Sequence, residues 1–187
     1  SSNKNQIFLD LEKKEIINKI IDLIPILDCV IFCTGILLGK ELEAYDPSEI
    51  LNVFQINVLG PIEILLKIKE KLNNKCSIVF IGSIAGSAGS FDEVYSSSKS
   101  ALNGLIKSLA KKSKKAIRYN IIAPGLIENS SMIKNFTQKE IENHKLQTPT
   151  NELNDLKKLA KVSFQICQDE WSQLNGQIID INGGRYV

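Results

Sequence analysis

The sequence predicts an α/β fold built on a doubly wound parallel sheet, and three observations support this. Short apolar runs rich in β-branched residues, at 29–33, 77–81 and 117–123, are typical of buried strands. Segments with apolar residues at helical spacing separate these runs, so that strand and helix alternate along the chain. Small residues, mainly glycine and serine, follow several of the strands, where open α/β sheets bind their ligands.

One globular domain accounts for the whole sequence. Its 187 residues are 43% hydrophobic and 24% charged, which is enough for a substantial core. The formal net charge of +2 is too balanced to favour nucleic acid or an anionic membrane as a partner. No apolar run approaches the roughly 20 residues of a membrane span, and no signal peptide opens the sequence, so we expect no membrane partner.

The four cysteines are not spaced as metal ligands, and we predict no metal site. They are Cys29, Cys33, Cys76 and Cys167. Because Cys29 and Cys33 lie in a strand-like run, we interpret them as buried free thiols. Free thiols indicate a reducing, cytoplasmic setting.

The first half of the chain begins with strand, helix and strand. The expected elements are a strand at 7–10, a helix at 12–24 and the strand at 29–33. Asp46 and Pro47 are typical of a helix start, and a long helix should run from there to Leu72. The pair Gly60–Pro61 should kink this helix.

The second half repeats the same alternation. A strand at 77–81 precedes a loop of small residues, 85–90, and a helix that opens at Tyr95. The expected elements after the strand at 117–123 are a polar, irregular segment at 128–150, a helix at 152–170 and a last strand with a glycine turn at 174–184.

Three side chains suggest proton chemistry. Tyr95 and Lys99 are four residues apart, so on a helix they share a face, and Ser83 follows the strand at 77–81. A free phenol has a pKa of about 10, and a nearby ammonium should lower it. A serine hydroxyl can hydrogen-bond the oxygen of a carbonyl or alcohol. We therefore predict that Tyr95 exchanges a proton with a substrate oxygen while a hydride moves at its carbon.

Ser83, Tyr95 and Lys99 resemble the catalytic set of the short-chain dehydrogenase/reductase family, in its single-domain, 3-oxoacyl-ACP-reductase-like branch. The resemblance covers nearly the whole chain. It includes Asn57-x-x-Gly60, the run from Arg118 to Ile127, and the closing glycine turn. It implies that Tyr95 is the general acid/base, that Lys99 is its partner and a ribose ligand, and that Asn57 supports a proton relay.

The resemblance also implies a dinucleotide site, with NADP or NAD as the cofactor. Small hydroxyls and a lysine at positions 1–4 favour the 2′-phosphate of NADP. The implied cofactor-binding residues are Asp10, Leu11, Gly35, Tyr95, Lys99, Pro124, Gly125, Ile127 and Asn129. Asn129 stands where the family has threonine, and an asparagine can still hydrogen-bond the nicotinamide carboxamide.

Two parts of the family pattern are missing. The strand at 29–33 ends in Cys33-Thr34-Gly35, where the family has Asn-Asn-Ala-Gly. No glycine-rich phosphate turn is present, and residue 1 aligns after the family's second strand, so about 35 residues of a βαβ unit are absent. We therefore expect residues 1–187 to form one Rossmann-like domain that is N-terminally incomplete, with the missing strands lying between 7–10 and 29–33.

The polar segment at 128–150 is expected to form a lid over the substrate. Met132 and Phe136 would line the substrate pocket or anchor the lid. The only histidine, His144, is interpreted as a solvated residue rather than a catalytic one.

The expected function is NAD(P)-dependent interconversion of a carbonyl and a secondary alcohol. The substrate is a small molecule that the sequence does not specify: acyl thioesters, sugars and small ketones all fit. The resemblance implies a homodimer or homotetramer formed through the helices at 47–72 and 95–113. A cofactor-sensing or scaffold protein with a relict site is one alternative, and a dehydratase or epimerase on the same fold is another.

Overall fold

The computed structural model describes residues 23–114 and 116–186 of the chain. The strand expected at 7–10 and all but the end of the helix expected at 12–24 lie outside the described residues. The four strands are β1 (Leu27–Phe32), β2 (Leu72–Ile81), β3 (Arg118–Pro124) and β4 (Ile178–Ile181). The α-helices are α2 (Pro47–Phe54), α3 (Gly60–Ile68), α4 (Ala85–Ala88), α5 (Glu93–Lys112), α6 (Gln138–Leu146) and α7 (Leu156–Gln165).

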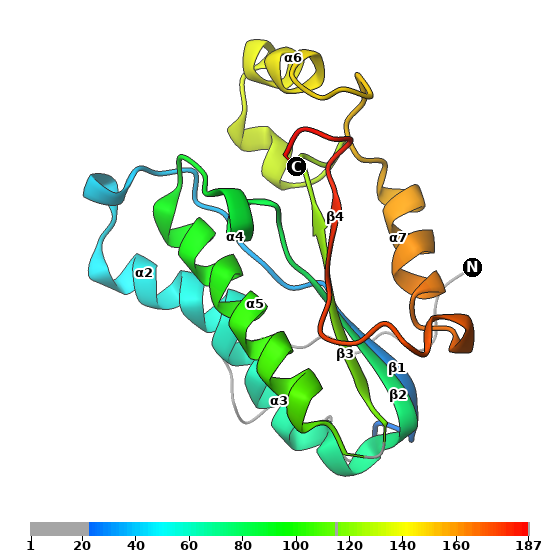
Figure 1. Cartoon of the computed structure of the whole chain (residues 1–187). Coiled ribbons are helices and arrows are strands. Elements are labelled where there is room, and N and C mark those ends of the chain that lie inside the picture. The colour runs from blue at the N-terminus through cyan, green and yellow to red at the C-terminus, as the bar shows by residue number, and fades with distance from the viewer. Residues whose placement is uncertain (1–22, 115, 187) are drawn as a thin grey trace.

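The strands form one parallel sheet in the order β1-β2-β3-β4. Val79 of β2 is paired with Ile31 of β1 on one side and with Asn120 of β3 on the other. Helices α2, α3 and α5 cover one face and α7 covers the opposite face, as Figure 1 shows. The predicted α/β fold with a doubly wound parallel sheet is therefore confirmed.

A separate apolar core fills the space on each face of the sheet. Alternate residues of a strand point to opposite faces, so Ile78 and Phe80 join the core beneath α3 and α5, while Val79 joins the core beneath α7. The Phe80 ring stacks on Phe32 with centroids 4.6 Å apart. Because both faces are covered, β2 is nearly continuously apolar from 76 to 81, as a central parallel strand should be.

The predicted long helix at 47–72 is continuous but changes its winding. Between α2 and α3 lies one π-helical turn, Gln55–Leu59, and a 3₁₀ turn, Lys69–Lys71, ends the helix. Pro61 has no N–H to donate, and the wider turn just before it lets the helix pass this residue without breaking. The expected disturbance at Gly60–Pro61 is thus a π turn in the residues that precede the pair.

By length and composition alone, this helix, Pro47–Lys71, is long and apolar enough to cross a membrane, contrary to the expectation that no such segment exists. It packs against α5 and buries the Asn57 amide in hydrogen bonds within the protein, so we interpret it as a packed helix of the domain. Only 28% of the apolar 18-residue stretch within this helix is buried. Two leucines on its outer face are largely exposed: the exposed fraction is 71% for Leu51 and 69% for Leu66.

Four local predictions were wrong. The small-residue loop at 85–90 contains the short helix α4, and the segment at 128–150 contains α6 and a 3₁₀ turn, Met132–Asn135. A capping box between Thr137 and Glu140 starts α6, with the Thr137 N–H donating to Glu140 at 2.7 Å. Cys33 is exposed rather than buried, because β1 ends at Phe32. The helix expected at 152–170 is also shorter, since α7 ends at Gln165.

Candidate active site

The candidate catalytic residues meet at the carboxyl end of the sheet. Ser83 follows β2, the segment Thr34–Gly35 follows β1, and Tyr95 and Lys99 lie in the first turns of α5. Figure 1 shows α4 and the start of α5 close to this end of the strands. The carboxyl ends of parallel strands are where α/β sheets bind ligands.

Tyr95 is largely buried, with its hydroxyl between two other side chains. Burial raises the pKa of the phenol, the Ser83 hydroxyl opposes this by hydrogen bonding to it, and the Asp92 charge raises it further. The hydroxyl also faces the Met132 sulfur at 4.0 Å. The predicted lowering of this pKa by Lys99 is therefore not found, because the loss of water outweighs every other influence on the phenol.

Lys99 has its ammonium inside the protein. Nζ donates to the backbone carbonyls of Ile81 at 3.1 Å and Thr34 at 3.3 Å, and it lies 5.9 Å from the centre of the Tyr95 ring. Burial lowers the pKa of Lys99 to about 8, against a smaller opposing effect of Cys33. Two carbonyls use two of the three ammonium hydrogens, so among the described groups one hydrogen remains for a ligand.

Gly35 gives this ammonium its space. A Cβ at position 35 would lie 2.8 Å from Lys99 Nζ and 3.6 Å from Asn57 Oδ1. The absence of a side chain, rather than a turn conformation, is therefore what position 35 requires. Beside it, the Thr34 hydroxyl oxygen is buried and has no hydrogen-bond partner among the described residues.

Asn57 lies in the π-helical turn and is fully buried. Its Oδ1 accepts from the Ile36 N–H at 2.8 Å, and its Nδ2 donates to Ile36 O at 3.0 Å and to Ser98 Oγ at 2.9 Å. Ser98 in turn donates to the carbonyl of Tyr95 at 2.7 Å. Asn57 thus holds the segment after β1 against α5, and one lone pair of Oδ1 remains for a further donor.

Asp92 is a site residue that our sequence analysis did not select. It is the N-cap of α5, fully buried, and its carboxylate accepts from the Tyr95 N–H at 2.8 Å. It also accepts from the Gly39 N–H at 3.0 Å and from the Tyr45 hydroxyl at 2.9 Å. An aspartate just before a helix is a recognisable cap signal, but nothing local indicates the contacts with residues 39 and 45.

Helix α4 packs very closely on α5 behind Ser83. A Cβ on Gly86 would lie 2.9 Å from the Lys99 backbone, and Ser96 donates to the carbonyl of Ala85 at 2.9 Å. The small residues at 85–90 therefore allow α4 to approach α5, which fixes Ser83 relative to Tyr95.

The predicted residues after β3 are only partly at the site. Pro124 ends β3 and its carbonyl accepts from the Ile84 N–H at 3.1 Å, so it lies beside the segment that carries Ser83. Gly125 donates to Ile181, and Ile127 packs in the core beneath α7. Asn129 is exposed with φ of +59°.

The left-handed backbone explains an asparagine at 129 without any cofactor contact, since asparagine tolerates this conformation well. Asp10 and Leu11 lie outside the described residues, so the adenine side of the predicted site has no structural description.

Arg118 and Asn120, which carried part of the resemblance, have structural roles. The Arg118 guanidinium donates to five backbone carbonyls at and beyond the end of α7, those of Ile166, Cys167, Gln168, Trp171 and Leu174. Asn120 donates to Leu174 O at 2.8 Å and accepts from the Gln177 N–H at 3.0 Å. Both residues fix the connection from α7 to β4.

Residues near the C-terminus contact the segment 128–150, which was predicted to be a lid. Arg185 donates to the His144 carbonyl at 3.0 Å and to Gln147 at 2.7 Å, and Thr148 and Thr150 pack on Gly183. His144 is half-buried against the Phe136 ring, and burial lowers its pKa. His144 lies in α6, and its half-burial differs from the expectation of a solvated residue. Of the predicted lid residues, Met132 has its sulfur 4.0 Å from the Tyr95 hydroxyl.

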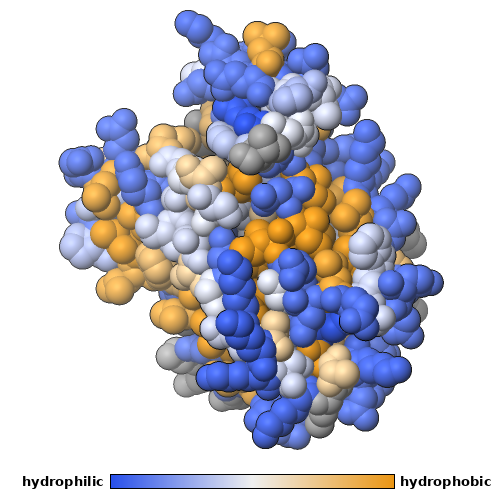
Figure 2. Space-filling model, viewed as in Figure 1, coloured by the Kyte–Doolittle hydropathy of each residue, from blue (hydrophilic) through white to orange (hydrophobic). Residues whose placement is uncertain are grey.

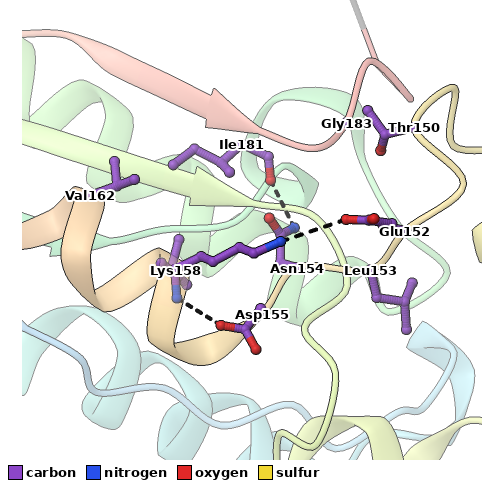
Figure 3. A pocket seen from close by; sticks show the side chains of 10 residues that line it. Thr150, Glu152, Leu153, Asn154, Asp155, Lys158, Val162, Ile181 and Gly183 are labelled. Carbon is purple, nitrogen blue, oxygen red and sulfur yellow. Dashed lines mark hydrogen bonds and ion pairs between the residues drawn. The ribbon is translucent and has the colours of Figure 1, made fainter.

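A hollow of about 220 Å³ lies beside the start of α7 (Figure 3). Glu152, Asn154 and Lys158 line it, and a wide ion pair of 3.8 Å joins Lys158 to Glu152. The Asn154 amide is already used, since it donates to Ile181 O at 2.8 Å. Neither Ser83 nor Tyr95 nor Lys99 lines this hollow.

Comparisons with known proteins agree with this geometry. A family described as enoyl-(acyl carrier protein) reductase matches residues 10–185. The chain is 30% identical over 165 residues to 3-oxoacyl-(acyl-carrier-protein) reductase FabG of Buchnera aphidicola subsp. Baizongia pistaciae, with 86% of this chain and 66% of that protein covered. It is 29% identical over 162 residues to the uncharacterized oxidoreductase YhdF of Bacillus subtilis, with 81% of this chain and 56% of that protein covered. The chain thus spans 56% to 66% of the length of these two relatives.

Solved structures of proteins of this kind are also similar to this chain. A short chain dehydrogenase family protein of Francisella tularensis is 25% identical with a TM-score of 0.88, covering 96% of this chain and 80% of that one. A 3-oxoacyl-(acyl-carrier protein) reductase of Brucella melitensis is 26% identical with a TM-score of 0.85, covering 97% and 71%.

Proposed function

Because the chain belongs to the short-chain dehydrogenase/reductase family, we propose that it is an NAD(P)-dependent oxidoreductase that interconverts a carbonyl and a secondary alcohol. One observation carries the proposal. The hydroxyls of Ser83 and Tyr95 and the ammonium of Lys99 come together at the carboxyl end of β2, where the family reaction needs a proton donor, an oxygen ligand and a cation.

The proposed roles follow from this arrangement. Tyr95 gives its proton to the substrate oxygen during reduction and takes it back during oxidation, and Ser83 hydrogen-bonds the same oxygen. Lys99 stabilises the phenolate that forms when the proton leaves. Because burial raises the pKa of Tyr95, the phenol is protonated at neutral pH, which favours its action as an acid and hence carbonyl reduction.

The residues around Gly35 fit the ribose and nicotinamide half of a dinucleotide. The buried Thr34 hydroxyl lacks a partner among the described residues, Lys99 has an uncommitted hydrogen, and position 35 has no side chain to exclude a ligand. Gly35, Tyr95, Lys99, Pro124 and Gly125 would hold this half, and a nicotinamide cofactor, when bound, supplies or accepts the hydride. We propose NADP ahead of NAD, on the sequence of residues 1–4.

For the substrate, we propose a 3-oxoacyl thioester as the first compound to test, because relatives from several bacteria are named 3-oxoacyl-(acyl-carrier-protein) reductase. We further propose a cytoplasmic homodimer or homotetramer. The exposed leucines on α2 and α3 support an assembly through these helices, and apolar residues gather over α2 at the left of Figure 2.

The test is a comparison of Tyr95→Phe with the parent protein, with Tyr186→Phe as a control at an exposed tyrosine. Oxidation of NADPH or NADH is followed with acetoacetyl-CoA, and hydride transfer from deuterium-labelled cofactor to product is measured by mass spectrometry. Tyr95→Phe should lower kcat by about 10²- to 10⁴-fold with the circular dichroism spectrum unchanged. Full activity in Tyr95→Phe, or turnover without label transfer, would contradict the proposal.

A further inference from the structure

Two thiols that the proposed reaction does not use lie against each other on the α7 side of the sheet. The sulfurs of Cys29, in β1, and Cys167, just after α7, are 2.7 Å apart although 138 positions separate them in the chain. Both side chains are half-buried, so a small molecule can reach them. The other two thiols differ from this pair, since Cys76 is buried and Cys33 is exposed.

The surroundings of the pair make its two members unequal. Cys29 donates its S–H to the Cys167 sulfur, which raises the pKa of Cys29 and lowers that of Cys167. Burial of Cys167 raises its pKa, and the nearby Ser77 hydroxyl lowers it. The Arg118 guanidinium donates to the Cys167 carbonyl at 3.1 Å and contributes a positive charge in the same direction. Cys167 is thus the more nucleophilic thiol.

We propose that Cys29 and Cys167 are a redox pair that a hydroperoxide oxidises to an intramolecular disulfide. The Cys167 thiolate attacks one peroxide oxygen, the O–O bond breaks, and the alcohol or water leaves with a proton, so that Cys167 becomes a sulfenic acid. The Cys29 sulfur then attacks the Cys167 sulfur, the S–O bond breaks, and water leaves with the Cys29 proton. The two sulfurs supply the two electrons that reduce the peroxide.

The bond would join the C-terminal end of α7 to β1. Disulfide formation needs the two sulfurs to move from 2.7 Å to about 2.05 Å, a shift that side-chain rotation can supply. A cross-link between positions so distant in sequence restricts the unfolded chain strongly. Oxidation should therefore raise the melting temperature, and a dithiol reductant should reverse the change.

The experiment uses the full, reduced protein treated with a small excess of hydrogen peroxide. Remaining thiols are then alkylated without reductant, and the digested protein is analysed by mass spectrometry. The expected product is a linked peptide pair that contains Cys29 and Cys167 and has lost two hydrogens, with a higher melting temperature. Cys33→Ser should behave like the parent protein, whereas Cys167→Ser should yield no linked pair and keep Cys29 alkylatable.

Two results would overturn the proposal. One is full alkylation of Cys29 and Cys167 after Cys33 has been oxidised, and the other is a linked pair that contains Cys33 or Cys76 in their place. Peptide mapping of the parent protein decides these points even if a serine variant fails to fold.

Discussion

The Asp92 carboxylate accepts a hydrogen bond from the backbone N–H of Tyr95 at 2.8 Å, and so ties the candidate acid/base to the segment after β1. The same carboxylate accepts from the Gly39 N–H and the Tyr45 hydroxyl, which come from that segment. One buried side chain therefore positions both the start of α5 and the loop that approaches it.

Two substitutions of Asp92 should separate its effect on the free energy of unfolding from its effect on the pKa of Tyr95. Asp92→Ala leaves three donors without their acceptor, one of them buried, and should lower the free energy of unfolding by about 2 to 4 kcal/mol. Asp92→Asn keeps an acceptor but removes the charge that helps to raise the pKa of Tyr95, so the alkaline limb of the kcat profile should move to lower pH. Urea denaturation and pH–rate profiles measure these effects, with the exposed Asp180→Asn as control. An unchanged profile in Asp92→Asn would refute the electrostatic part.

Gly35→Ala should weaken both cofactor binding and the fold. The new Cβ would come within 3 Å of the Lys99 ammonium alone, and moving this buried charge off its carbonyls should lower the free energy of unfolding by about 1.5 to 3 kcal/mol. The displaced ammonium would leave the carbonyls of Ile81 and Thr34, and NADPH affinity should fall at least about tenfold, because one well-made charged hydrogen bond contributes about 1.5 to 3 kcal/mol.

Gly104→Ala is the matched control for this glycine. Gly104 lies in α5, and a Cβ there would meet nothing within 4 Å. The alanine should stabilise the helix by about 0.5 to 1 kcal/mol with cofactor affinity unchanged. Fluorescence titration with NADPH compares the two variants, and equal affinities would show that position 35 lies away from the cofactor.

Lys99 should make stability depend on alkaline pH. Its pKa is lowered from the usual 10.5 to about 8, so between these values the unfolded chain binds more protons than the folded one. The free energy of unfolding therefore rises with pH through this window, by up to about 3 kcal/mol. Below pH 8 the cost of burying the charge is constant.

The Lys99→Met variant has no titrating group at this position, so its comparison with the parent protein isolates the contribution of Lys99 to the pH dependence of stability. The stability of the parent protein relative to Lys99→Met should increase from pH 7.5 to pH 10, as measured by urea denaturation. A difference that stays constant over this range would mean that the ammonium is solvated in the folded protein.

Arg118 should be important for stability rather than for catalysis. Arg118→Met removes a charged donor from five backbone carbonyls and should cost about 3 to 5 kcal/mol. Arg118→Lys restores the charge but not the planar fork of donors and should recover only part of this loss. Arg185→Met, which removes two hydrogen bonds near the lid, should cost less. Equal losses for Arg118→Met and Arg185→Met in thermal denaturation would contradict the prediction.

Leu66 tests the proposed assembly. Leu66→Lys places a charge on the outer face of α3 and should convert the oligomer to a monomer in light scattering. Leu146→Lys on α6 is matched in exposure, at 70% against 69%, and should leave the molar mass unchanged. A parent protein that is monomeric, or a Leu66→Lys variant that stays oligomeric, would exclude an interface on this helix.

Short-range patterns were enough to predict the strands of the parallel sheet, the long helices and the set Ser83, Tyr95 and Lys99. Alternation of buried strands and amphipathic helices depends on neighbouring residues, and the four-residue spacing of Tyr95 and Lys99 depends only on helix geometry. The capping box at Thr137 was equally local, and reading it would have predicted α6 within the segment that we expected to be irregular.

The sequence by itself determined the fold class, the family and which polar side chains form the candidate site. Each of these could be predicted from patterns of residues that are close together in the chain. Only the tertiary structure decided how those groups behave. Burial is the largest influence on the pKa values of Tyr95 and Lys99, larger than that of any neighbouring group. Likewise, the contacts of Asp92 with Tyr45 and of Cys29 with Cys167 join segments 47 and 138 positions apart. Solvent exclusion and long-range contact are properties of the packed molecule, and no local pattern encodes them.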